Sequence, residues 1–361
     1  MYFFRGLVED WYDRNRDSIF EKTKSDPEIA HEKFVKIARR ADKFSSSGLL
    51  LNNPANELIT RVEISNAAGF NKNGTIPPSF LKYLGFDRVV VGTVTHDAWA
   101  GNPERPRIWR FPETESLVNF LGLPGVGSSQ VARNLESFGD HKVPLTINLM
   151  STPGKTGDEA LKDLEGTIKD LRDLPYVDRW ELNISCPNTH CGIGTEAREQ
   201  YQSNLSGMLG VVETYVLDDH LIDVKVSPDL DESGVDSTVY TIVGFRVRAV
   251  SLTNTTTEHD PHYITSSPGK GGASGHALYD RALSVQKMFE ERSDGRYSIN
   301  AVGGIDSVEK ARERISSGKV GGIQVFTGLI YRGPRLVREL REGLDIADML
   351  MEKSDTPLFI G

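Results

Sequence analysis

The sequence predicts an α/β protein, a TIM (β/α)8 barrel with a small N-terminal helical extension. From about residue 60 onward, eight short β-rich runs alternate with helical stretches, a pattern typical of parallel strands joined by helices. The chain has 361 residues, which leaves room for a barrel of roughly 250 to 300 residues. Residues 1–48 differ from the rest because they are rich in charge and helix formers. A doubly wound parallel sheet is the main alternative.

Two helices are expected in the extension, residues 1–48, ahead of a barrel formed by residues 49–361. The first has aromatic and aliphatic residues at helical spacing on one face: Phe3, Phe4, Leu7, Val8 and Trp11. The second begins near Asp26-Pro27 and has an apolar face of Ala30, Phe34, Ile37, Ala38 and Ala41. Two interpretations stay open. The faces pack on the barrel, or part of this aromatic surface meets a membrane or an apolar ligand.

The candidate strands are short runs rich in β-branched residues. They are Val62–Ala67, Arg88–Thr95, Pro144–Leu149, Arg179–Ser185, Ile222–Val226, Ala249–Thr253, Tyr297–Val302 and Gly322–Phe326. Helical segments lie between most of them, for example Gly157–Leu174 and Ser307–Ser317.

Polar and small residues gather where these strands end, which in a barrel is the face that carries catalytic groups. The strand ends carry the segment 66–74, Thr93, Asn148, the segment 183–188, Lys225, Thr253–Thr255, Gly303-Gly304 and Thr327-Gly328. A single asparagine or threonine at a strand end is usually a turn former. The repetition at almost every strand predicts a ligand site.

The last two strand ends indicate a phosphate, because loops after the seventh and eighth strands bind phosphate in many barrels. Backbone N–H groups of glycine-rich loops form anion sites, although the same glycines could be simple turns. Lys225 lies within a strand. Facing the barrel interior, it would need a negative partner, and it could stabilise the charge of a reduced flavin. Alternatively it faces outward into solvent.

Composition limits the function classes. The net charge of −9 argues against a general nucleic-acid-binding role. The two cysteines, Cys186 and Cys191, suit a reducing compartment, and with His190 they lack further ligands at metal-site spacing, so no metal is predicted. No run of about 18 apolar residues is present. A cytoplasmic protein is expected.

Six segments together resemble dihydroorotate dehydrogenases. They are 66–74 (Asn-Ala-Ala-Gly-Phe-Asn-Lys-Asn-Gly), 91–95 (Val-Gly-Thr-Val-Thr), 101–107 (Gly-Asn-Pro, then Arg-Pro-Arg), 183–189 (Asn-Ile-Ser-Cys-Pro-Asn-Thr), 253–256 (Thr-Asn-Thr-Thr) and 302–306 (Val-Gly-Gly-Ile-Asp). The matches follow one another in order along the chain. The resemblance implies the barrel fold, FMN as cofactor, and oxidation of dihydroorotate to orotate in pyrimidine synthesis.

The resemblance also implies residue roles. FMN would be held by Ala68, Gly69, Thr93, Asn148, Asn183, Lys225, Thr253, Gly275, Gly304, Thr327 and Gly328. The pyrimidine would be held by Lys72, Asn119, Asn183, Asn188, Asn254 and Thr255. Cys186 would be the catalytic base that removes a proton from dihydroorotate.

Two features of the sequence indicate different electron acceptors. The segment from Asp26 to Glu32 resembles the helical extension of class 2, quinone-linked members, which implies a quinone and attachment to the inner face of the cell membrane. Cys186 departs from the serine usual in class 2 and is typical of the soluble class 1. Fumarate is the rival acceptor. Two functions from other classes remain, a flavin-free isomerase or aldolase barrel with Lys225 as Schiff-base lysine, and a non-catalytic membrane-associated binding protein.

Overall fold

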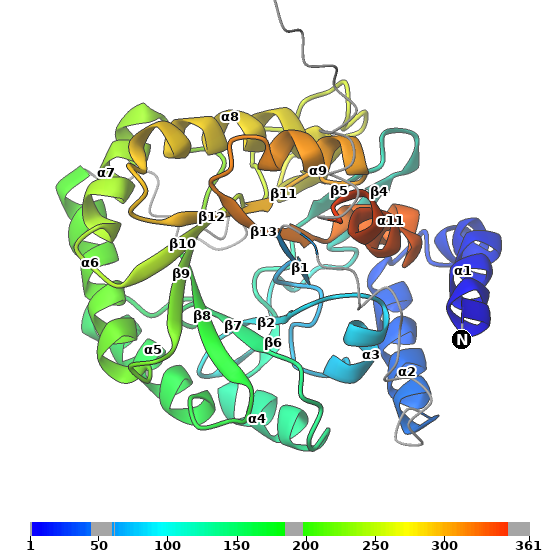
Figure 1. The fold of residues 1–361 in the computed structure, drawn as a ribbon, viewed down its shortest axis with the longest axis horizontal. Coiled ribbons are helices and arrows are strands. Elements are labelled where there is room, and N and C mark those ends of the chain that lie inside the picture. Colours follow the sequence, from blue (N-terminus) through cyan, green and yellow to red (C-terminus); the bar gives the residue numbers. More distant parts are fainter. Residues whose placement is uncertain (1, 45–59, 61, 185–197, 346–361) are drawn as a thin grey trace, which may run out of the picture.

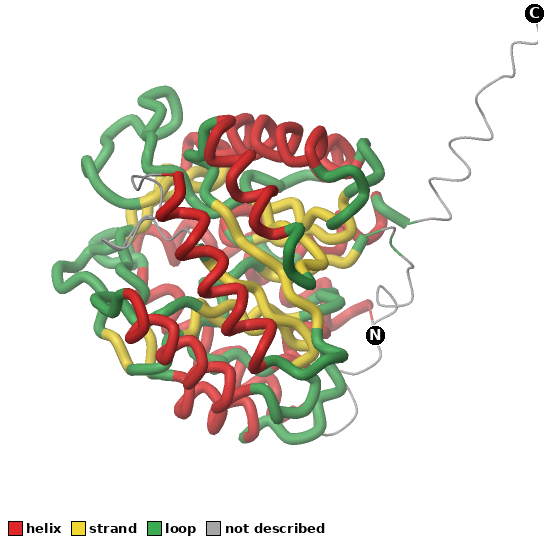
Figure 2. Tube along the Cα trace, turned by 90° about the vertical axis from the view of Figure 1, so that its left-hand side faces the viewer, coloured by secondary structure: helices red, strands yellow, loops and turns green. Residues whose placement is uncertain are grey.

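The computed structural model describes residues 2–44, 60, 62–184 and 198–345. Eight parallel strands surround one core and helices cover them on the outside (Figures 1 and 2). The barrel strands are β1 (Glu63–Asn66), β2 (Val89–Val94), β7 (Leu145–Leu149), β8 (Val177–Asn183), β9 (Leu221–Val226), β10 (Val247–Leu252), β12 (Ser298–Val302) and β13 (Val320–Val325). All eight predicted strands are confirmed, within a few residues at their ends.

The barrel closes between its first two strands. Hydrogen bonding runs in the order β1-β13-β12-β10-β9-β8-β7-β2, and a parallel bridge from Ser65 to Arg88 joins the two ends. Asn66 completes this seam, since its side chain donates to the Val90 carbonyl at 2.8 Å and accepts from the Val90 amide at 3.1 Å. The closed barrel is therefore confirmed over the doubly wound alternative.

The barrel helices follow the strands in sequence. They are α3 (Pro78–Tyr83), α4 (Ser128–Glu136), α5 (Gly157–Leu171), α6 (Arg198–Tyr215), α7 (Glu232–Ile242), α8 (His276–Arg292), α9 (Val308–Ile315), α10 (Thr327–Arg332) and α11 (Arg335–Gly343). The predicted helices at Gly157–Leu174 and Ser307–Ser317 are confirmed as α5 and α9. Strand residues such as Trp180 and Ile147 pack beneath helix residues such as Leu164 and Phe289 in one hydrophobic core.

Two small antiparallel sheets sit in the loops at the carboxyl ends of the barrel strands. One pairs β3 (Ala98–Trp99) with β6 (Gly125–Val126), and the other runs β11 (Gly272–Gly275), β5 (Ser116–Asn119) and β4 (Ile108–Phe111). A short 3-10 turn, Pro112–Thr114, joins β4 to β5. The sequence analysis did not predict these strands, because they are short and lack the hydrophobic alternation of longer ones.

Helix α1 (Tyr2–Lys22) docks on α10 and α11 beside the barrel (Figure 1). Its docking contacts are largely polar: the Tyr12 hydroxyl donates to the Ile330 carbonyl, and Glu9 and Asp13 pair with arginines of α11. Phe20 adds an edge-to-face contact with Tyr331. The described docking contacts thus come mainly from outside the predicted apolar stripe. Trp11 of that stripe is 48% exposed, and the side chains of Phe3, Phe4 and Leu7 lie outside the described set.

Helix α2 (Glu28–Phe44) begins where the sequence predicts, and the Asp26 side chain accepts from the Glu28 amide at 3.2 Å. Ala38 is fully buried, and Phe34 packs on the core with Ala41. The placement of Ile37 on the packed face is wrong, because Ile37 is 46% exposed. Within the described residues, no helix is long and apolar enough to cross a membrane.

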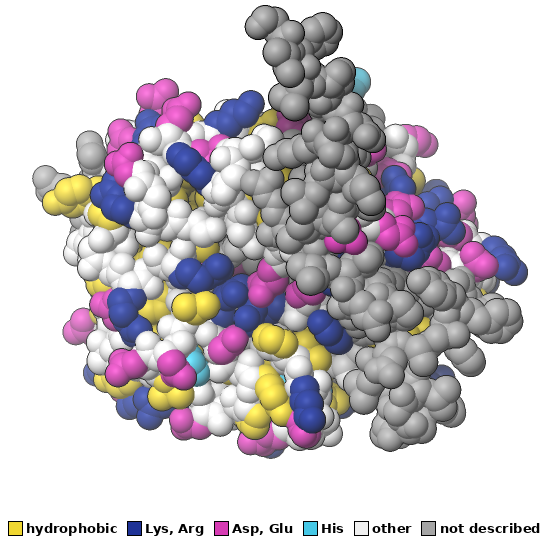
Figure 3. Space-filling model, viewed as in Figure 1, with side chains coloured by type: hydrophobic (Ala, Val, Ile, Leu, Met, Phe, Trp, Pro, Cys, Tyr) yellow, Lys and Arg dark blue, Asp and Glu magenta, His cyan; other side chains and the backbone are white. Residues whose placement is uncertain are grey.

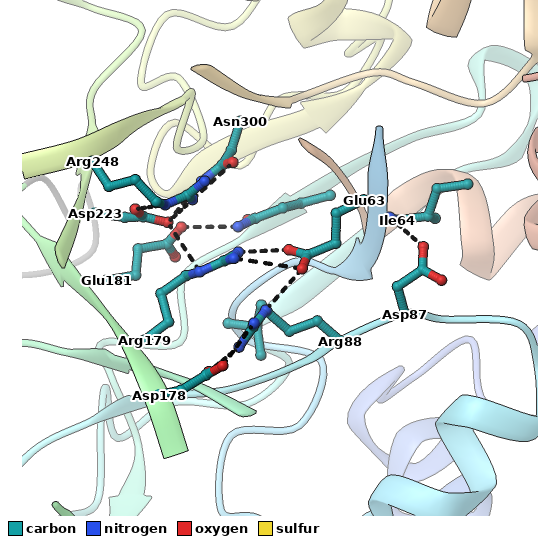
Figure 4. Close-up of polar contacts among 12 residues, drawn as sticks. Glu63, Ile64, Asp87, Arg88, Asp178, Arg179, Glu181, Asp223, Arg248 and Asn300 are labelled. Carbon is teal, nitrogen blue, oxygen red and sulfur yellow. Dashed lines mark hydrogen bonds and ion pairs between the residues drawn. The ribbon is translucent and has the colours of Figure 1, made fainter. Parts of the chain in front are cut away.

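An ion-pair network occupies the amino-terminal end of the barrel interior (Figure 4). Glu63 of β1 binds Arg88 beside β2 at 3.1 Å and Arg179 of β8 at 2.5 Å. Asp223 of β9 accepts two hydrogen bonds from Arg248 of β10, at 2.6 and 2.9 Å. Burial alone would raise the pKa of Glu63, but the charges of Arg88 and Arg179 hold it below its usual value. On the face of the molecule that Figure 3 shows, acidic and basic side chains are interspersed.

Candidate active site at the carboxyl end of the barrel

Amide and hydroxyl side chains from three strand ends join in one hydrogen-bonded chain. The Asn183 side chain at the end of β8 donates to the Thr93 hydroxyl of β2 at 3.1 Å. Asn254, after β10, donates to the Asn183 side-chain oxygen at 3.2 Å and accepts from the Thr255 amide at 2.9 Å. The sequence analysis assigned Thr93, Asn183, Asn254 and Thr255 to one site, and these four residues lie together.

A buried carboxylate lies directly below this chain. Glu181 of β8 is fully buried and accepts from Asn148 of β7 at 2.7 Å, from Gln324 of β13 at 2.9 Å, and from Ser251 of β10. Asn148 thus engages its side-chain nitrogen in a hydrogen bond to Glu181. Its side-chain oxygen is buried and has no hydrogen-bond partner among the described residues. A buried acceptor without a donor suits a ligand N–H group.

Lys225 of β9 belongs to the interior of the barrel. It is 4% exposed and stands in register with Asn183 on β8 and Ser251 on β10. The alternative of an outward-facing, solvated lysine is therefore excluded. A buried ammonium here places positive charge beside the carboxyl ends of the strands, where it stabilises negative charge on a bound group.

Three glycine loops, which contain Gly275, Gly304 and Gly328, meet at the other side of the site. A Cβ on Gly304 would lie 2.9 Å from the Gly275 carbonyl, and a Cβ on Gly328 would lie 2.7 Å from the Ile305 carbonyl. Ser274 and Thr327 join two of the loops through a hydroxyl contact of 2.8 Å. Only glycine allows the loops to approach so closely, and backbone N–H groups of such glycine loops suit an anion.

Arg314 of α9 supports these loops from behind. This fully buried arginine donates to the carbonyls of Leu252 at 2.8 Å, Gly303 at 3.1 Å and Val302 at 3.3 Å. Burial lowers its pKa to about 10, so it stays charged at neutral pH. It fixes the ends of β10 and β12 relative to each other and adds positive charge beneath the glycine loops.

The remaining predicted residues lie on the loops around the strand ends. Ala68 and Gly69 follow β1, and the Gly69 amide donates to the Gly92 carbonyl at 2.6 Å. Asn119 ends β5, and its side chain donates to the Gly272 carbonyl of β11 at 3.3 Å. Thr253 follows β10, and its amide donates to the Val302 carbonyl at 2.9 Å. The Lys72 charge acts on Glu28 and His31 of α2, which places Lys72 near that helix.

The proposed base, Cys186, lies outside the described residues, as do Asn188, His190 and Cys191. Among the residues that are described, Glu115, His276 and Asp306 form a group of metal-ligand type. Asp306 already accepts from the Lys310 ammonium at 2.9 Å and meets His276 at 2.5 Å. The Lys310 ammonium therefore balances the charge of Asp306.

Sequence reasoning missed Glu181 and Arg314. A signal for Glu181 exists, since a carboxylate interrupts the otherwise apolar end of a predicted buried strand, Trp180-Glu181-Leu182. No comparable signal marks Arg314. It shares α9 with Arg312, and only the packing of that helix decides which arginine is buried.

Comparison with known proteins agrees with this architecture. Residues 57–347 match a family model described as dihydroorotate dehydrogenase. A dihydroorotate dehydrogenase (quinone) of Natronomonas pharaonis is 33% identical over 279 residues, 77% of this chain and 76% of that protein. The enzyme of the same name from Nautilia profundicola is 30% identical and covers 89% of each chain. The crystal structure of DHODH from Eimeria tenella in complex with ferulenol superimposes with a TM-score of 0.76 at 24% identity, covering 91% of this chain and 92% of that one.

Proposed function

This chain belongs to the dihydroorotate dehydrogenase family, and we propose that it oxidises (S)-dihydroorotate to orotate in pyrimidine synthesis and passes the electrons through FMN to a quinone. The observation that carries this proposal is the chain of Thr93, Asn183 and Asn254 beside a buried Lys225. Such a set offers donors, acceptors and one cation at the face of the barrel where catalysis occurs.

FMN fits the residues that are present. The buried Asn148 oxygen suits an N–H of a flat ring, and the glycine loops suit a phosphate. Gly69 has a φ of +95°, a backbone conformation that residues with a side chain rarely adopt. Lys225 would stabilise negative charge on the ring. Ala68, Thr93, Asn183, Thr253, Gly275, Gly304, Thr327 and Gly328 complete the proposed FMN site. When bound, FMN supplies the acceptor for the hydride that leaves C6 of the substrate.

The protein side chains hold and deprotonate the substrate. Lys72 would pair with its carboxylate, while Asn119, Asn183, Asn188, Asn254 and Thr255 would bind the amide edge of the ring. Cys186, as thiolate, would take the proton from C5. The ordinary cysteine pKa of about 8.5 leaves only a few per cent thiolate near neutral pH, so positive charge close to Cys186 would favour the step.

An aromatic path supports a quinone that enters between α2 and the barrel. Phe34 of α2 meets Phe70 at 5.5 Å between ring centroids, and Phe70 meets Phe326 at 5.7 Å. Phe70 follows Gly69, and Phe326 precedes Thr327, so the path ends at the proposed FMN site. His31 borders Phe70, and burial lowers its pKa to about 4, so it is neutral at physiological pH. A cluster of aromatic rings with a neutral histidine suits a quinone and disfavours the dianion fumarate.

We further propose that the extension, residues 1–48, rests on the inner face of the cell membrane. The exposed stripe of α2 contains Ile29 and Ile37 among Lys33, Lys36 and Arg40. Apolar residues flanked by basic ones are the composition of a helix that lies on an anionic bilayer. On α1, the exposed Trp11 would join this contact, with Phe3, Phe4 and Leu7.

Sedimentation with phosphatidylglycerol vesicles tests the membrane contact. Ile37→Asp should reduce vesicle binding at least about tenfold, since it removes apolar area and adds a repelled charge. Val243→Asp is the matched control, because Val243 is also exposed but lies at the end of α7. Equal binding of the two variants would contradict the proposed surface.

The function itself is tested by adding dihydroorotate to the purified protein without oxygen and following the flavin absorption band. We expect bleaching that a short-chain quinone reverses and fumarate does not. Reversal by fumarate alone would overturn the quinone assignment. A colourless protein would overturn the oxidoreductase assignment and favour a flavin-free barrel. A yellow protein that dihydroorotate does not bleach would overturn dihydroorotate as the substrate.

A further inference from the structure

We propose that Glu28 and Arg107 are positioning residues for pyrimidine binding. Their ion pair fastens the first turn of α2 to the loops that carry Asn119. The N-terminal extension thereby takes part in dihydroorotate binding as well as in access of the acceptor. This inference rests on the proposed function, and the experiment below separates the failure of one from the failure of the other.

The pair is bidentate and almost buried. Arg107 donates from Nε to Glu28 Oε1 at 2.9 Å and from Nη2 to Glu28 Oε2 at 2.6 Å. The two side chains are 9% and 12% exposed. Burial would raise the pKa of Glu28, but its hydrogen bond to Arg107 and the positive charges of Arg107, Arg105 and Lys72 hold it below the usual value. The carboxylate therefore stays ionised, and a planar fork of this kind fixes direction as well as distance.

The third nitrogen of Arg107 holds a turn in place. Nη1 donates to the carbonyls of Ala100 at 2.9 Å and Asn102 at 3.0 Å. All three nitrogens of the guanidinium are thus engaged, two with α2 and one with the segment between β3 and β4. Lysine at this position could not reproduce that geometry, because its ammonium is a single point of charge.

The turn that contains Asn102 holds the loop that follows Asn119. The Asn102 amide donates to the Leu121 carbonyl at 2.9 Å, and its side chain donates to the Phe120 carbonyl at 3.0 Å. The Phe120 amide donates to the Arg107 carbonyl at 2.7 Å. A Cβ on Gly122 would lie 2.7 Å from the Asn102 amide nitrogen, so the two segments are in contact. Three backbone groups that follow Asn119, the Phe120 amide and the Phe120 and Leu121 carbonyls, are therefore hydrogen-bonded to Arg107 or Asn102.

A second link runs from Glu28 toward the substrate. The positive charge of Lys72, which would bind the substrate carboxylate, contributes to the low pKa of Glu28. Loss of the Glu28 charge would therefore release the loop that carries Asn119 and also remove a negative charge that acts on Lys72.

The same helix supplies a matched control. Glu32 lies one turn after Glu28, and it binds Arg105 at 3.2 Å. Its side chain is 54% exposed and that of Arg105 is 43% exposed. Exposed pairs of this kind contribute little to stability or positioning. Glu32→Gln removes the same charge from the same helix without touching Arg107.

The experiment compares the FMN-loaded wild type with Glu28→Gln, Arg107→Lys, the double variant and Glu32→Gln. The Kd of orotate is measured by calorimetry, and the limiting rate of flavin reduction by stopped flow. We expect Kd to rise about tenfold or more in both single variants, with the limiting rate changed less than about threefold. The double variant should bind no more weakly than the weaker single variant, because both changes break one unit. Glu32→Gln should match the wild type.

Hydrogen exchange on the wild type tests the same link without any substitution. Orotate should slow amide exchange in residues 28–34 and 100–107, since binding and helix seating stabilise each other reciprocally. Unchanged exchange in both segments overturns the inference, as does an unchanged Kd in Glu28→Gln or an equal loss in Glu32→Gln. A wild type that neither binds orotate nor bleaches with dihydroorotate overturns the proposed function instead.

Discussion

At the scale of single residues, the site depends on side chains that carry both a donor and an acceptor. Asn183 uses both, giving a hydrogen to Thr93 and accepting one from Asn254. Asn148 donates to Glu181, and its buried side-chain oxygen has no hydrogen-bond partner among the described residues. Because a protein partner holds each side-chain amide, the directions in which that amide can donate or accept further hydrogen bonds are fixed. Such orientation suits a rigid planar substrate and a rigid planar cofactor.

Cys186→Ala should lower the limiting rate of flavin reduction by about 10²- to 10⁴-fold, because a positioned general base contributes about that much. FMN content should stay at one per chain, since Cys186 is not among the proposed FMN residues. Stopped-flow reduction and flavin absorbance measure the two quantities. A variant that reduces flavin at the wild-type rate would exclude Cys186 as base.

Lys225→Met should make the two-electron potential of the bound flavin more negative by at least about 30 mV, roughly 1.4 kcal/mol, because the buried positive charge that favours the reduced ring is lost. Equilibration against dyes of known potential measures the shift. Lys287→Met, on the outer face of α8, is the control and should leave the potential unchanged. A potential that stays the same in Lys225→Met would remove the lysine from the flavin site.

At this scale, the strand-end residues were predictable and their partners were not. Thr93, Asn148, Asn183 and Lys225 follow from the positions of the strands, since parallel strands bring their carboxyl ends to one face. Glu181 lies below these residues and is marked in the sequence only by its charge within a buried strand, whereas nothing in the local sequence distinguishes the buried Arg314 from Arg312. The pair of Glu28 and Arg107 joins positions 79 residues apart, and only the fold brings them together.

At the scale of elements, the docking of α1 depends on one glycine. Gly333, between α10 and α11, has a positive φ of +67°, and a Cβ there would lie 3.0 Å from one ring carbon of Tyr12 and closer to another. The same tyrosine donates its hydroxyl to the Ile330 carbonyl. The corner between α10 and α11 is thus shaped to receive Tyr12.

Gly333→Ala should release α1 and lower the stability of the protein by about 1–3 kcal/mol, because it combines backbone strain with a clash against Tyr12. Hydrogen exchange in residues 9–22 and thermal unfolding measure the two effects. Gly139→Ala is the matched control, since Gly139 has a similar φ of +63° and open space around its Cβ position. Faster exchange in α1 for both variants alike would show that backbone strain, and not the contact with Tyr12, is responsible.

The two helices of the extension show where pattern reading succeeds and where it does not. The start of α2 was predictable from Asp26-Pro27, because capping is a local interaction. The exposure of Ile37 was not, because the width of the buried face of a helix depends on what packs against it. The polar docking of α1 was also not predictable, since its partners lie in α10 and α11 at the other end of the chain.

At the scale of the whole molecule, ion pairs connect strands across the amino-terminal end of the barrel. Glu63 connects β1 to Arg88 beside β2 and to Arg179 in β8, across the interior (Figure 4). Glu63→Gln should reduce stability at pH 7 by about 3 kcal/mol, because it leaves two buried arginines without this partner. Urea unfolding at pH 7 measures the change.

The pH dependence has a definite sign. The folded-state pKa of Glu63 lies below its ordinary value, so the unfolded state binds the proton more readily. Its contribution to stability is complete above the unfolded pKa of about 4.5 and is lost as the pH falls through the lower, folded-state pKa. Glu63→Gln should therefore unfold less steeply with acid than the wild type below about pH 4.5. Parallel acid-unfolding curves would contradict this role for Glu63.

The pairing of β1 with β13 also governs when the protein can fold during its synthesis. β1 hydrogen-bonds to a strand that ends at Val325, and α1 docks on helices that end at Gly343. At about 5–20 residues per second, a ribosome makes 361 residues in roughly 20–70 s. For most of that time β1 has no neighbour on one edge, and the extension has no surface to dock on. The nascent chain must therefore be kept from associating with other chains until β13 and α11 have emerged.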